Sequence, residues 1–178
     1  LTPATTGDDS AEAGDLDILD ELVIRGAGSA STTIDAGGVD RVFDNFHLLT
    51  LSGVRLVGGD PEAIGTDFGD LVLADGLVTD NVIGINGGFQ NLSIADSHFE
   101  ANELAANVTT CDAFSMVDTT VERNGSGFGF DRATGTLERV AFRENTGDAV
   151  AVFIQSRLTM QRATIENNGR GLAHLRGD

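Results

Sequence analysis

A unit of about 22 residues repeats through most of this 178-residue chain. Six segments share one pattern, in which the first, third and eighth positions are nearly always apolar and the eleventh is usually asparagine. Their first residues are 21 to 23 positions apart. The segments are LTLSGVRLVGG from Leu49, LVLADGLVTDN from Leu71, LSIADSHFEAN from Leu92, FSMVDTTVERN from Phe114, GTLERVAFREN from Gly135 and LTMQRATIENN from Leu158. A repeat of this length is typical of solenoids and other repeat architectures.

The apolar positions within each unit predict short β-strands. Apolar and polar residues alternate in three stretches per unit, and none of these stretches has the spacing of a helix. Three short strands that repeat without reversing direction form one coil of a parallel β-solenoid, with equivalent residues stacked about 4.8 Å apart. Parallel crossovers are right-handed in the great majority of cases. We therefore predict an all-β fold, a right-handed parallel β-helix with three short strands per coil of about 22 residues.

The recurring asparagine supports this prediction over other all-β folds. It occupies the eleventh position of five units: Asn81, Asn102, Asn124, Asn145 and Asn168. Stacked side-chain amides can hydrogen-bond to one another along a solenoid, whereas an antiparallel β-sandwich gives no reason for asparagine to return at a fixed position. Asn168-Gly169 taken alone is a hairpin signal. Within the repeat we expect it to be the last rung of an asparagine ladder, where the chain turns without reversing.

The repeat also suggests how the chain is organised. Residues 49–178 are expected to form six regular coils. The register loosens in residues 16–48, which we expect to form an N-terminal cap of opening coils over the exposed strand edges. Residues 1–15 are polar and acidic, and we expect a flexible segment. The chain begins with Leu1 rather than Met, so we expect it to be a piece of a longer protein.

The N-terminal part also carries a recognisable motif. The stretch GDLDILDELVIRGAGSASTTIDAGGVDRVF, residues 14–43, is followed by LSGVRL at residues 51–56. Together they resemble the start of the pectin-lyase-like right-handed β-helix domains of large secreted or cell-surface bacterial proteins. The resemblance implies the same fold and a secreted or cell-surface location. It implies no single activity, because that superfamily holds lyases, hydrolases, epimerases, adhesins and modules without known chemistry.

Stacking turns the fifth position of the repeat into a column with two interpretations. Asp75, Asp96 and Asp118 lie one coil apart in this column, and a cation such as Ca²⁺ would relieve their mutual repulsion. The resemblance to β-helix polysaccharide lyases implies a catalytic role for Arg139, the next residue of the column, as the base that takes a proton from the substrate. The structural alternative is that aspartate turns the chain between two strands, and we favour this one.

Two further groups of charged residues are expected to be solvated. At the ninth and tenth positions, Glu122 neighbours Arg143 and Arg123 neighbours Glu144, which predicts a surface ladder of weak ion pairs. The stretch GGDPEAIGTDFGD, residues 58–70, places four carboxylates in what we expect to be one Gly-rich loop. Calcium binding there is conceivable, but the spacing matches no EF-hand pattern.

Composition limits the partners. The net charge is −17 and all eleven basic residues are arginine, so phosphate backbones and anionic lipid surfaces would be repelled. We expect no nucleic-acid partner, and no membrane insertion because no apolar run approaches about 20 residues. Cations or neutral ligands fit better. His47, His98 and His174 share no column, which argues against a histidine-based metal site or catalytic triad.

These observations favour a role without chemistry. Sugar-binding grooves usually offer Trp or Tyr rings, and the chain has neither. We expect a non-catalytic structural or adhesive β-helix module of a secreted or cell-surface bacterial protein, with a polysaccharide, a surface glycan or Ca²⁺ as candidate ligands. One alternative is a polysaccharide-processing enzyme, a calcium-dependent lyase or epimerase that uses the aspartate column. The other is end-to-end self-association through the strand edges of the last coil.

Overall fold

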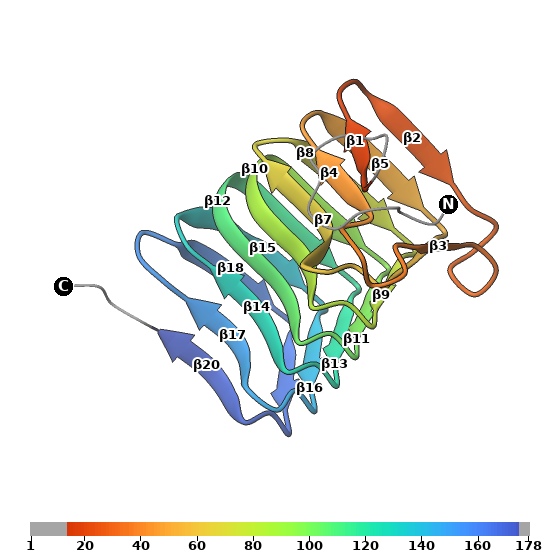
Figure 1. Ribbon diagram of the computed structural model, residues 1–178. Coiled ribbons are helices and arrows are strands. Elements are labelled where there is room, and N and C mark those ends of the chain that lie inside the picture. The colour runs from red at the N-terminus through yellow and green to blue at the C-terminus, as the bar shows by residue number, and fades with distance from the viewer. Residues whose placement is uncertain (1–13, 175–178) are drawn as a thin grey trace.

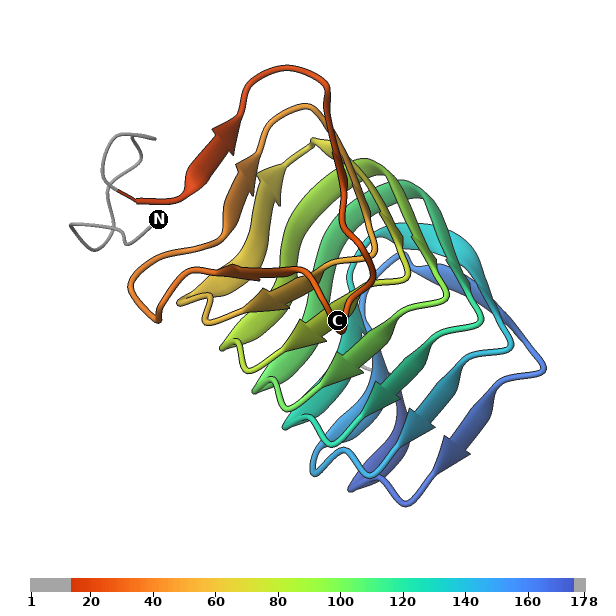
Figure 2. The ribbon, with the colours of Figure 1, turned by 90° about the vertical axis from the view of Figure 1, so that its right-hand side faces the viewer.

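A computed structural model shows a chain that winds around one axis in stacked coils (Figures 1 and 2). It describes residues 14–174, and the predicted flexible segment 1–15 lies almost entirely outside them. Every strand pairing within the described range is parallel, and equivalent residues of successive coils pair in register. The predicted all-β parallel solenoid is therefore confirmed.

Each coil places its strands on three faces, and on each face they are ordered along the axis. The first face consists of β1 (Leu16–Ile18), β4 (Phe43–Asn45), β7 (Glu62–Asp67), β10 (Ile83–Ala95), β12 (Leu104–Val117), β14 (Ser126–Phe130), β17 (Asp148–Val152) and β20 (Arg170–His174). The second face consists of β2 (Leu22–Arg25), β5 (Leu48–Ser52), β8 (Asp70–Ala74), the second halves of β10 and β12, β15 (Ala133–Glu138) and β18 (Arg157–Gln161). The third face consists of β3 (Thr33–Asp35), β6 (Arg55–Val57), β9 (Leu77–Thr79), β11 (His98–Glu100), β13 (Thr120–Glu122), β16 (Ala141–Arg143) and β19 (Thr164–Glu166).

The interior is filled by columns of apolar side chains, one from each coil. Val78, Phe99, Val121 and Phe142 pair in register along the third face, and all four are fully buried. The ring of Phe128, from the first face, lies with its centroid 5.3 Å from that of Phe99 and at 81° to it, an edge-to-face arrangement that aromatic pairs favour. Each coil therefore buries its apolar side against the coils stacked on it.

The fifth and tenth positions of the repeat have left-handed backbone. At the fifth position, between the second and third faces, φ is 48° to 62°. The residues there are Gly53, Asp75, Asp96, Asp118, Arg139 and Arg162. This conformation brings Cβ close to the backbone, which costs energy in most residues. Glycine has no Cβ, and aspartate can offset the cost through local hydrogen bonds of its short side chain. Turn geometry is therefore a sufficient reason for aspartate to recur at this position.

The recurring asparagines lie in a hydrogen-bonded ladder at the corner that follows the third face. From Asn81 to Asn145, each side-chain amide donates to the Oδ1 of the next asparagine at 2.8 to 3.0 Å, and Asn168 is the last acceptor. The same Oδ1 accepts the backbone N–H of the preceding asparagine. The strands on either side, β19 and β20, pair in parallel with β16 and β17, so Asn168-Gly169 is a corner and not a hairpin tip.

The N-terminal part follows the same winding. Residues 16–48 hold β1 to β4 and the first residue of β5, and these strands pair in parallel with the coils that follow. The predicted loop at residues 58–70 is wrong, because β7 occupies its central part. Ile64 stacks between Phe43 and Ile85 in the buried column of the first face, and this burial outweighs the turn-forming tendency of the glycines. Within residues 14–174, no helix has the length and apolar character to cross a bilayer.

Candidate functional site

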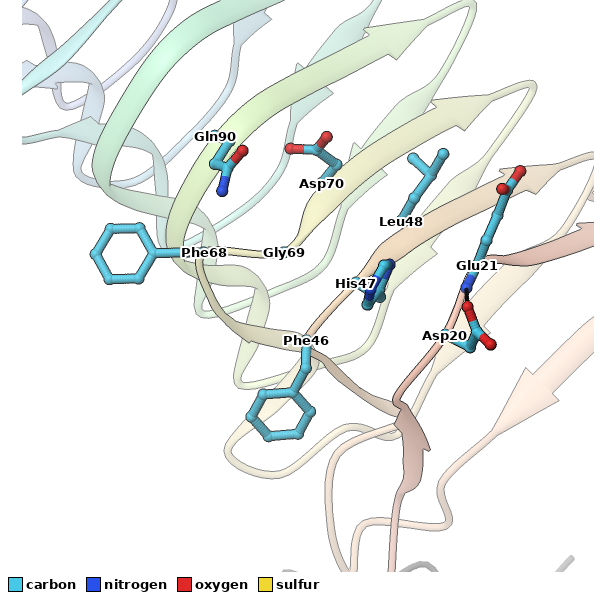
Figure 3. Close-up of a pocket in the computed structure, with 9 residues that line it drawn as sticks. All are labelled: Asp20, Glu21, Phe46, His47, Leu48, Phe68, Gly69, Asp70 and Gln90. Atoms are coloured by element: carbon cyan, nitrogen blue, oxygen red, sulfur yellow. Dashed lines mark hydrogen bonds between the residues drawn. The ribbon is translucent and has the colours of Figure 1, made fainter.

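A hollow of about 400 Å³ opens at the corner between the first and second faces, in the N-terminal half of the molecule (Figure 3). Its lining comes from four successive coils, so at about 4.8 Å per coil it extends roughly 14 Å along the axis. The lining residues are Asp20, Glu21, Phe46, His47, Leu48, Phe68, Gly69, Asp70 and Gln90. A hollow of this shape fits an extended ligand that lies along the stack of coils.

Two exposed aromatic side chains distinguish this corner. Phe46 and Phe68 project from neighbouring coils (Figure 3), and they are 45% and 58% exposed. Phe68 has a φ of 71°, a left-handed conformation that is strained for a bulky residue. Strain of this kind is concentrated at ligand-binding and active sites, where the surrounding structure enforces it. This corner therefore presents an exposed ring, that of Phe68, on a residue whose backbone conformation is unfavourable for it.

Buried polar groups hold the corner in place. The side-chain amide of Asn45 donates to the carbonyl oxygen of Asp70 at 3.0 Å. The Thr66 hydroxyl donates to the carbonyl oxygen of Asn45 at 2.5 Å and accepts the N–H of Gly69 at 2.8 Å. Asn45 and Thr66 are both buried. Because these bonds link consecutive coils on both sides of Phe68, the two rings stand on a fixed support.

Two glycines let the next coil pass close beneath Phe68. Gly87 has a φ of 135°, and a Cβ there would overlap the carbonyl oxygen of Thr66. The register between β10 and β12 shifts between Gly87 and Gly88, as in a β-bulge. A Cβ on Gly88 would lie 3.4 Å from Cε1 of Phe68, so the Phe68 ring already lies beside bare backbone. Bulges are common next to functional sites because they redirect the strand.

The polar lining of the hollow is acidic. Asp70 is held in place by Asn91, whose backbone N–H donates to Oδ1 at 2.9 Å. Asp20 and Glu21 add two exposed carboxylates, and none of the nine lining residues is an arginine. Anionic ligands are therefore repelled, while neutral or cationic ligands can use the carboxylates as hydrogen-bond acceptors.

A second hollow, of about 460 Å³, lies on the other side of Phe46. Its lining includes Arg41, Asp44 and Glu62. The guanidinium of Arg41 bridges two carboxylates, with Nε 2.9 Å from Oδ2 of Asp15 and Nη1 3.0 Å from Oδ2 of Asp44. Asp15, Asp44 and Glu62 are buried, which is rare for carboxylates unless their charges are compensated.

Compensation in this buried group is incomplete. Burial raises the pKa of Asp15 to about 6, although the charge of Arg41 lowers it, and three neighbouring aspartates raise it further. Burial also raises the pKa of Glu62, again against the charge of Arg41. One guanidinium therefore does not offset the carboxylates that surround it.

The predicted aspartate column lies at a different corner. Asp75, Asp96 and Asp118 are exposed turn residues, and Asp118 accepts two hydrogen bonds from Arg139 at 2.6 and 2.7 Å. This pairing lowers the pKa of Asp118 and raises that of Arg139, which makes the guanidinium a poor proton acceptor. Within residues 14–174, some groups of three side chains hold their potential metal-ligand atoms within 4.8 Å of one another. None of these groups includes a residue of the aspartate column. The calcium and catalytic roles of these residues stay predictions.

The third face carries the predicted charged ladder and one unexpected cluster. Arg143 Nε lies 2.5 Å from Oε2 of Glu122, and Arg123 Nη1 lies 2.5 Å from Oε1 of the same carboxylate. His98 joins them, with Nε2 3.3 Å from Oε1 of Glu122 and 3.9 Å from Oε2 of Glu100. Burial raises the pKa of Glu122, but the hydrogen bond from Arg143 and the neighbouring positive charges outweigh it and lower the pKa overall. The two arginines already occupy these carboxylates, so the cluster is an ion-pair network.

The sequence contains a signal for the aromatic corner that composition obscures. Phe46 and Phe68 are 22 residues apart, which is one period of the repeat, so extending the repeat upstream of Leu49 places them at the same corner of neighbouring coils. The absence of Trp and Tyr argues against a sugar-binding surface only if phenylalanine is left out. The buried group around Arg41 has no comparable signal, because Asp15 and Glu62 are 47 residues apart and meet only through the stacking of coils.

Comparison with known proteins supports the fold. Residues 65–178 match the family model described as the right handed beta helix region. No curated protein and no solved structure matches the chain. The matched segment covers more than half of the sequence and includes the strands from the middle of β7 to β20. This chain therefore belongs to the right-handed β-helix family.

Proposed function

We propose that the chain is a non-catalytic β-helix module of a secreted or cell-surface bacterial protein and that it binds a glycan at the corner of Phe46 and Phe68. The supporting observation is that two phenylalanines with exposed rings, on neighbouring coils, line a hollow that also contains polar groups. Phenylalanine rings offer apolar faces on which the C–H-rich face of a sugar can stack, and His47, Asp70 and Gln90 supply hydrogen-bonding groups beside them. A rigid solenoid suits this role because it holds successive contacts at a fixed spacing.

The charge of the site selects the class of glycan. The hollow of about 400 Å³ presents three carboxylates and no arginine, in a chain with a net charge of −17. A polyuronate or a sulfated chain would be repelled both by these carboxylates and by the net charge of the chain. Neutral sugars avoid this repulsion, and the positive charge of an amino sugar is attracted by the carboxylates. The proposed ligand is therefore a neutral or amine-bearing oligosaccharide.

An oligosaccharide array tests the proposal. Neutral, amino-sugar and uronate oligosaccharides are screened for binding, and the affinity for the strongest neutral or amino sugar is then measured by calorimetry. Replacing one ring, in Phe68→Ala or Phe46→Ala, is expected to weaken binding about tenfold or more, since loss of a stacked ring removes roughly 1–3 kcal/mol of contact. Binding only to uronates, or to none of the sugars, contradicts the proposal.

Ile154 provides a matched control. It is 49% exposed and lies at the same corner, between β17 and β18, but far along the axis from the hollow. Ile154→Ala removes a comparable exposed apolar group and is expected to leave sugar affinity unchanged. Equal losses in Ile154→Ala and Phe68→Ala would show that binding does not depend on the hollow.

A calcium-dependent lyase or epimerase has weaker support. It requires Arg139 to accept a proton, and Arg139 is held in a two-bond pair with Asp118. Incubation with pectate, alginate and glycosaminoglycans, followed by the ultraviolet absorbance of unsaturated products, tests this alternative. Product formation that Arg139→Gln abolishes would replace the binding proposal with a catalytic one.

Self-association is a second candidate function, favoured by an apolar hollow beside the last strands that the structure describes. A hollow of about 380 Å³ lies between β18 and β20, lined by apolar residues that include Leu158, Met160 and the 59% exposed Leu172. At the opposite end, β1 and β2 expose Leu16 and Leu22 on the corresponding faces. A second copy stacked end to end would pair parallel strands of both chains and extend into a filament.

Light scattering tests this self-association. The molecular mass is expected to rise with protein concentration in the wild type and not in Leu172→Glu. A mass that stays that of the monomer at all concentrations contradicts self-association.

A further inference from the structure

The buried carboxylates of the first two coils form a second candidate site, independent of the aromatic corner. Asp17 on β1 pairs in register with Asp44 on β4, and these two strands lie side by side (Figure 1). Asp15 lies just before β1. One carboxylate oxygen from each of these three residues lies within 4.8 Å of the others. Oxygens that each contact one central ion at about 2.4 Å are at most about 4.8 Å apart, so the three lie close enough together to share a single calcium ion.

Asp15 supplies the observation that points to a ligand. The residue is 2% exposed, and its carboxylate is completely buried. Oδ2 faces Arg41 in an ion pair, whereas the buried Oδ1 has no hydrogen-bond partner among the described residues. A buried carboxylate oxygen without a partner is costly, and native structures rarely leave one in place. An ion bound between the two coils would contact this oxygen.

The local charge also calls for a cation. Four carboxylates act on the guanidinium of Arg41, and each of them raises its pKa and so favours the charged form of the arginine. They belong to Asp15, Asp40, Asp44 and Glu62. The group therefore has several negative charges for one positive charge, in a region shielded from water. A bound divalent cation would offset two of them and draw the first coil onto the second.

The ligand set favours calcium over other cations. The converging atoms are all carboxylate oxygens, with no histidine or cysteine in the group. Zinc prefers nitrogen and sulfur, and magnesium demands a near-ideal octahedron, whereas calcium accepts six to eight oxygens in irregular geometry, including backbone carbonyls and water. We propose that Asp15, Asp17 and Asp44 form a calcium site that fastens the N-terminal coil to the rest of the β-helix.

Calcium titration of the full chain tests the proposal. The protein is stripped with EDTA, dialysed into buffer at pH 7.5 and titrated with CaCl₂, with heat followed by calorimetry and unfolding by thermal melting. The wild type is expected to bind about one Ca²⁺ per chain and to melt at a higher temperature when it is bound. Asp17 is partly exposed, so the Asp17→Asn variant should fold. This substitution is expected to weaken calcium affinity about tenfold or more. Asp15→Asn should do the same.

Asp96→Asn is the matched control. It removes the same charge from the exposed column at the fifth position, where asparagine keeps the left-handed turn. Calcium binding equal to that of the wild type in this variant, with loss in Asp17→Asn and Asp15→Asn, supports the site. The proposal is overturned by an absence of heat and melting shift in the wild type, by unchanged binding in both cluster variants, or by equal loss in Asp96→Asn. Sugar binding is measured separately, so a failure here leaves the aromatic corner as it stands.

Discussion

The backbone N–H of Phe68 donates to the carbonyl oxygen of Gly88 at 2.8 Å, so that an exposed, strained phenylalanine is fastened to the bare backbone of the next coil. Two consecutive glycines, Gly87 and Gly88, lie within β10 where it passes Phe68. They allow the coil to pass under the ring, and the ring then faces solvent above a fixed support. The aromatic corner is thus built into the stacking of the coils.

The two glycines are expected to differ sharply when they are replaced. Gly87→Ala places a Cβ against the carbonyl oxygen of Thr66 at a φ of 135°, so we expect a loss of about 2 kcal/mol or more in the free energy of unfolding. Gly88→Ala meets only an ordinary contact with Phe68, at 3.4 Å, and should cost less than about 1 kcal/mol. Urea unfolding of both variants measures this, and equal losses would contradict the described corner.

The middle of the asparagine ladder is expected to be its most sensitive part. Asn124 is buried, and its amide donates to Asn145, to the carbonyl of Phe99 and to the carbonyl of Glu122 at 3.0 to 3.1 Å. Asn124→Ala removes these three hydrogen bonds and the two that the Asn124 Oδ1 accepts from the backbone N–H and the side-chain amide of Asn102. We expect a loss of about 3 kcal/mol, measured by urea unfolding.

The end of the ladder supplies the control for that prediction. Asn168 is only partly buried, so water can replace the hydrogen bonds that Asn168→Ala removes. Its loss of unfolding free energy should be less than half that of Asn124→Ala. A larger loss at Asn168 would mean that the ladder does not derive its effect from burial.

Acid should remove a defined part of the stability through Glu122. Its folded pKa is lowered below the ordinary 4.5 by Arg143, Arg123 and His98, so the folded state favours the charged form. Glu122 therefore stabilises the fold above about pH 4.5, and this contribution is lost as the pH falls through the lowered folded pKa. Glu122→Gln should cost about 2 kcal/mol at pH 7 and much less near pH 3. A difference between wild type and variant that does not change with pH would refute this account of Glu122.

The turn interpretation of the fifth position gives a prediction for Arg139. Its φ of 54° is unfavourable for arginine and free of cost for glycine, while its ion pair with Asp118 is exposed and contributes little. Arg139→Gly should therefore leave the melting temperature unchanged or raise it slightly. A marked fall in the melting temperature would show that the pair with Asp118 matters more than the turn.

The sequence predicts the parts of the fold that repeat. From Leu49 onward, the apolar positions and the asparagine at position eleven mark the second face, the third face and the corner after it, because each coil has to satisfy the same stacking. The first face of the early coils escapes prediction, since β7 lies in a stretch with several glycines and its burial depends on pairing with β4 and β10. The Asp15 cluster escapes for the same reason, as its members come from separate coils.

The most direct test of the glycan proposal locates the bound sugar on the molecule. The isotope-labelled protein is titrated with the neutral or amine-bearing oligosaccharide selected on the array, and amide chemical shifts are followed by NMR. We predict that the largest shifts occur at residues 46–48, 68–70 and 88–91, along the hollow in Figure 3. Shifts concentrated instead around Asp96 and Arg139, or on the third face around Glu122, would contradict the proposal that the aromatic corner is the binding site.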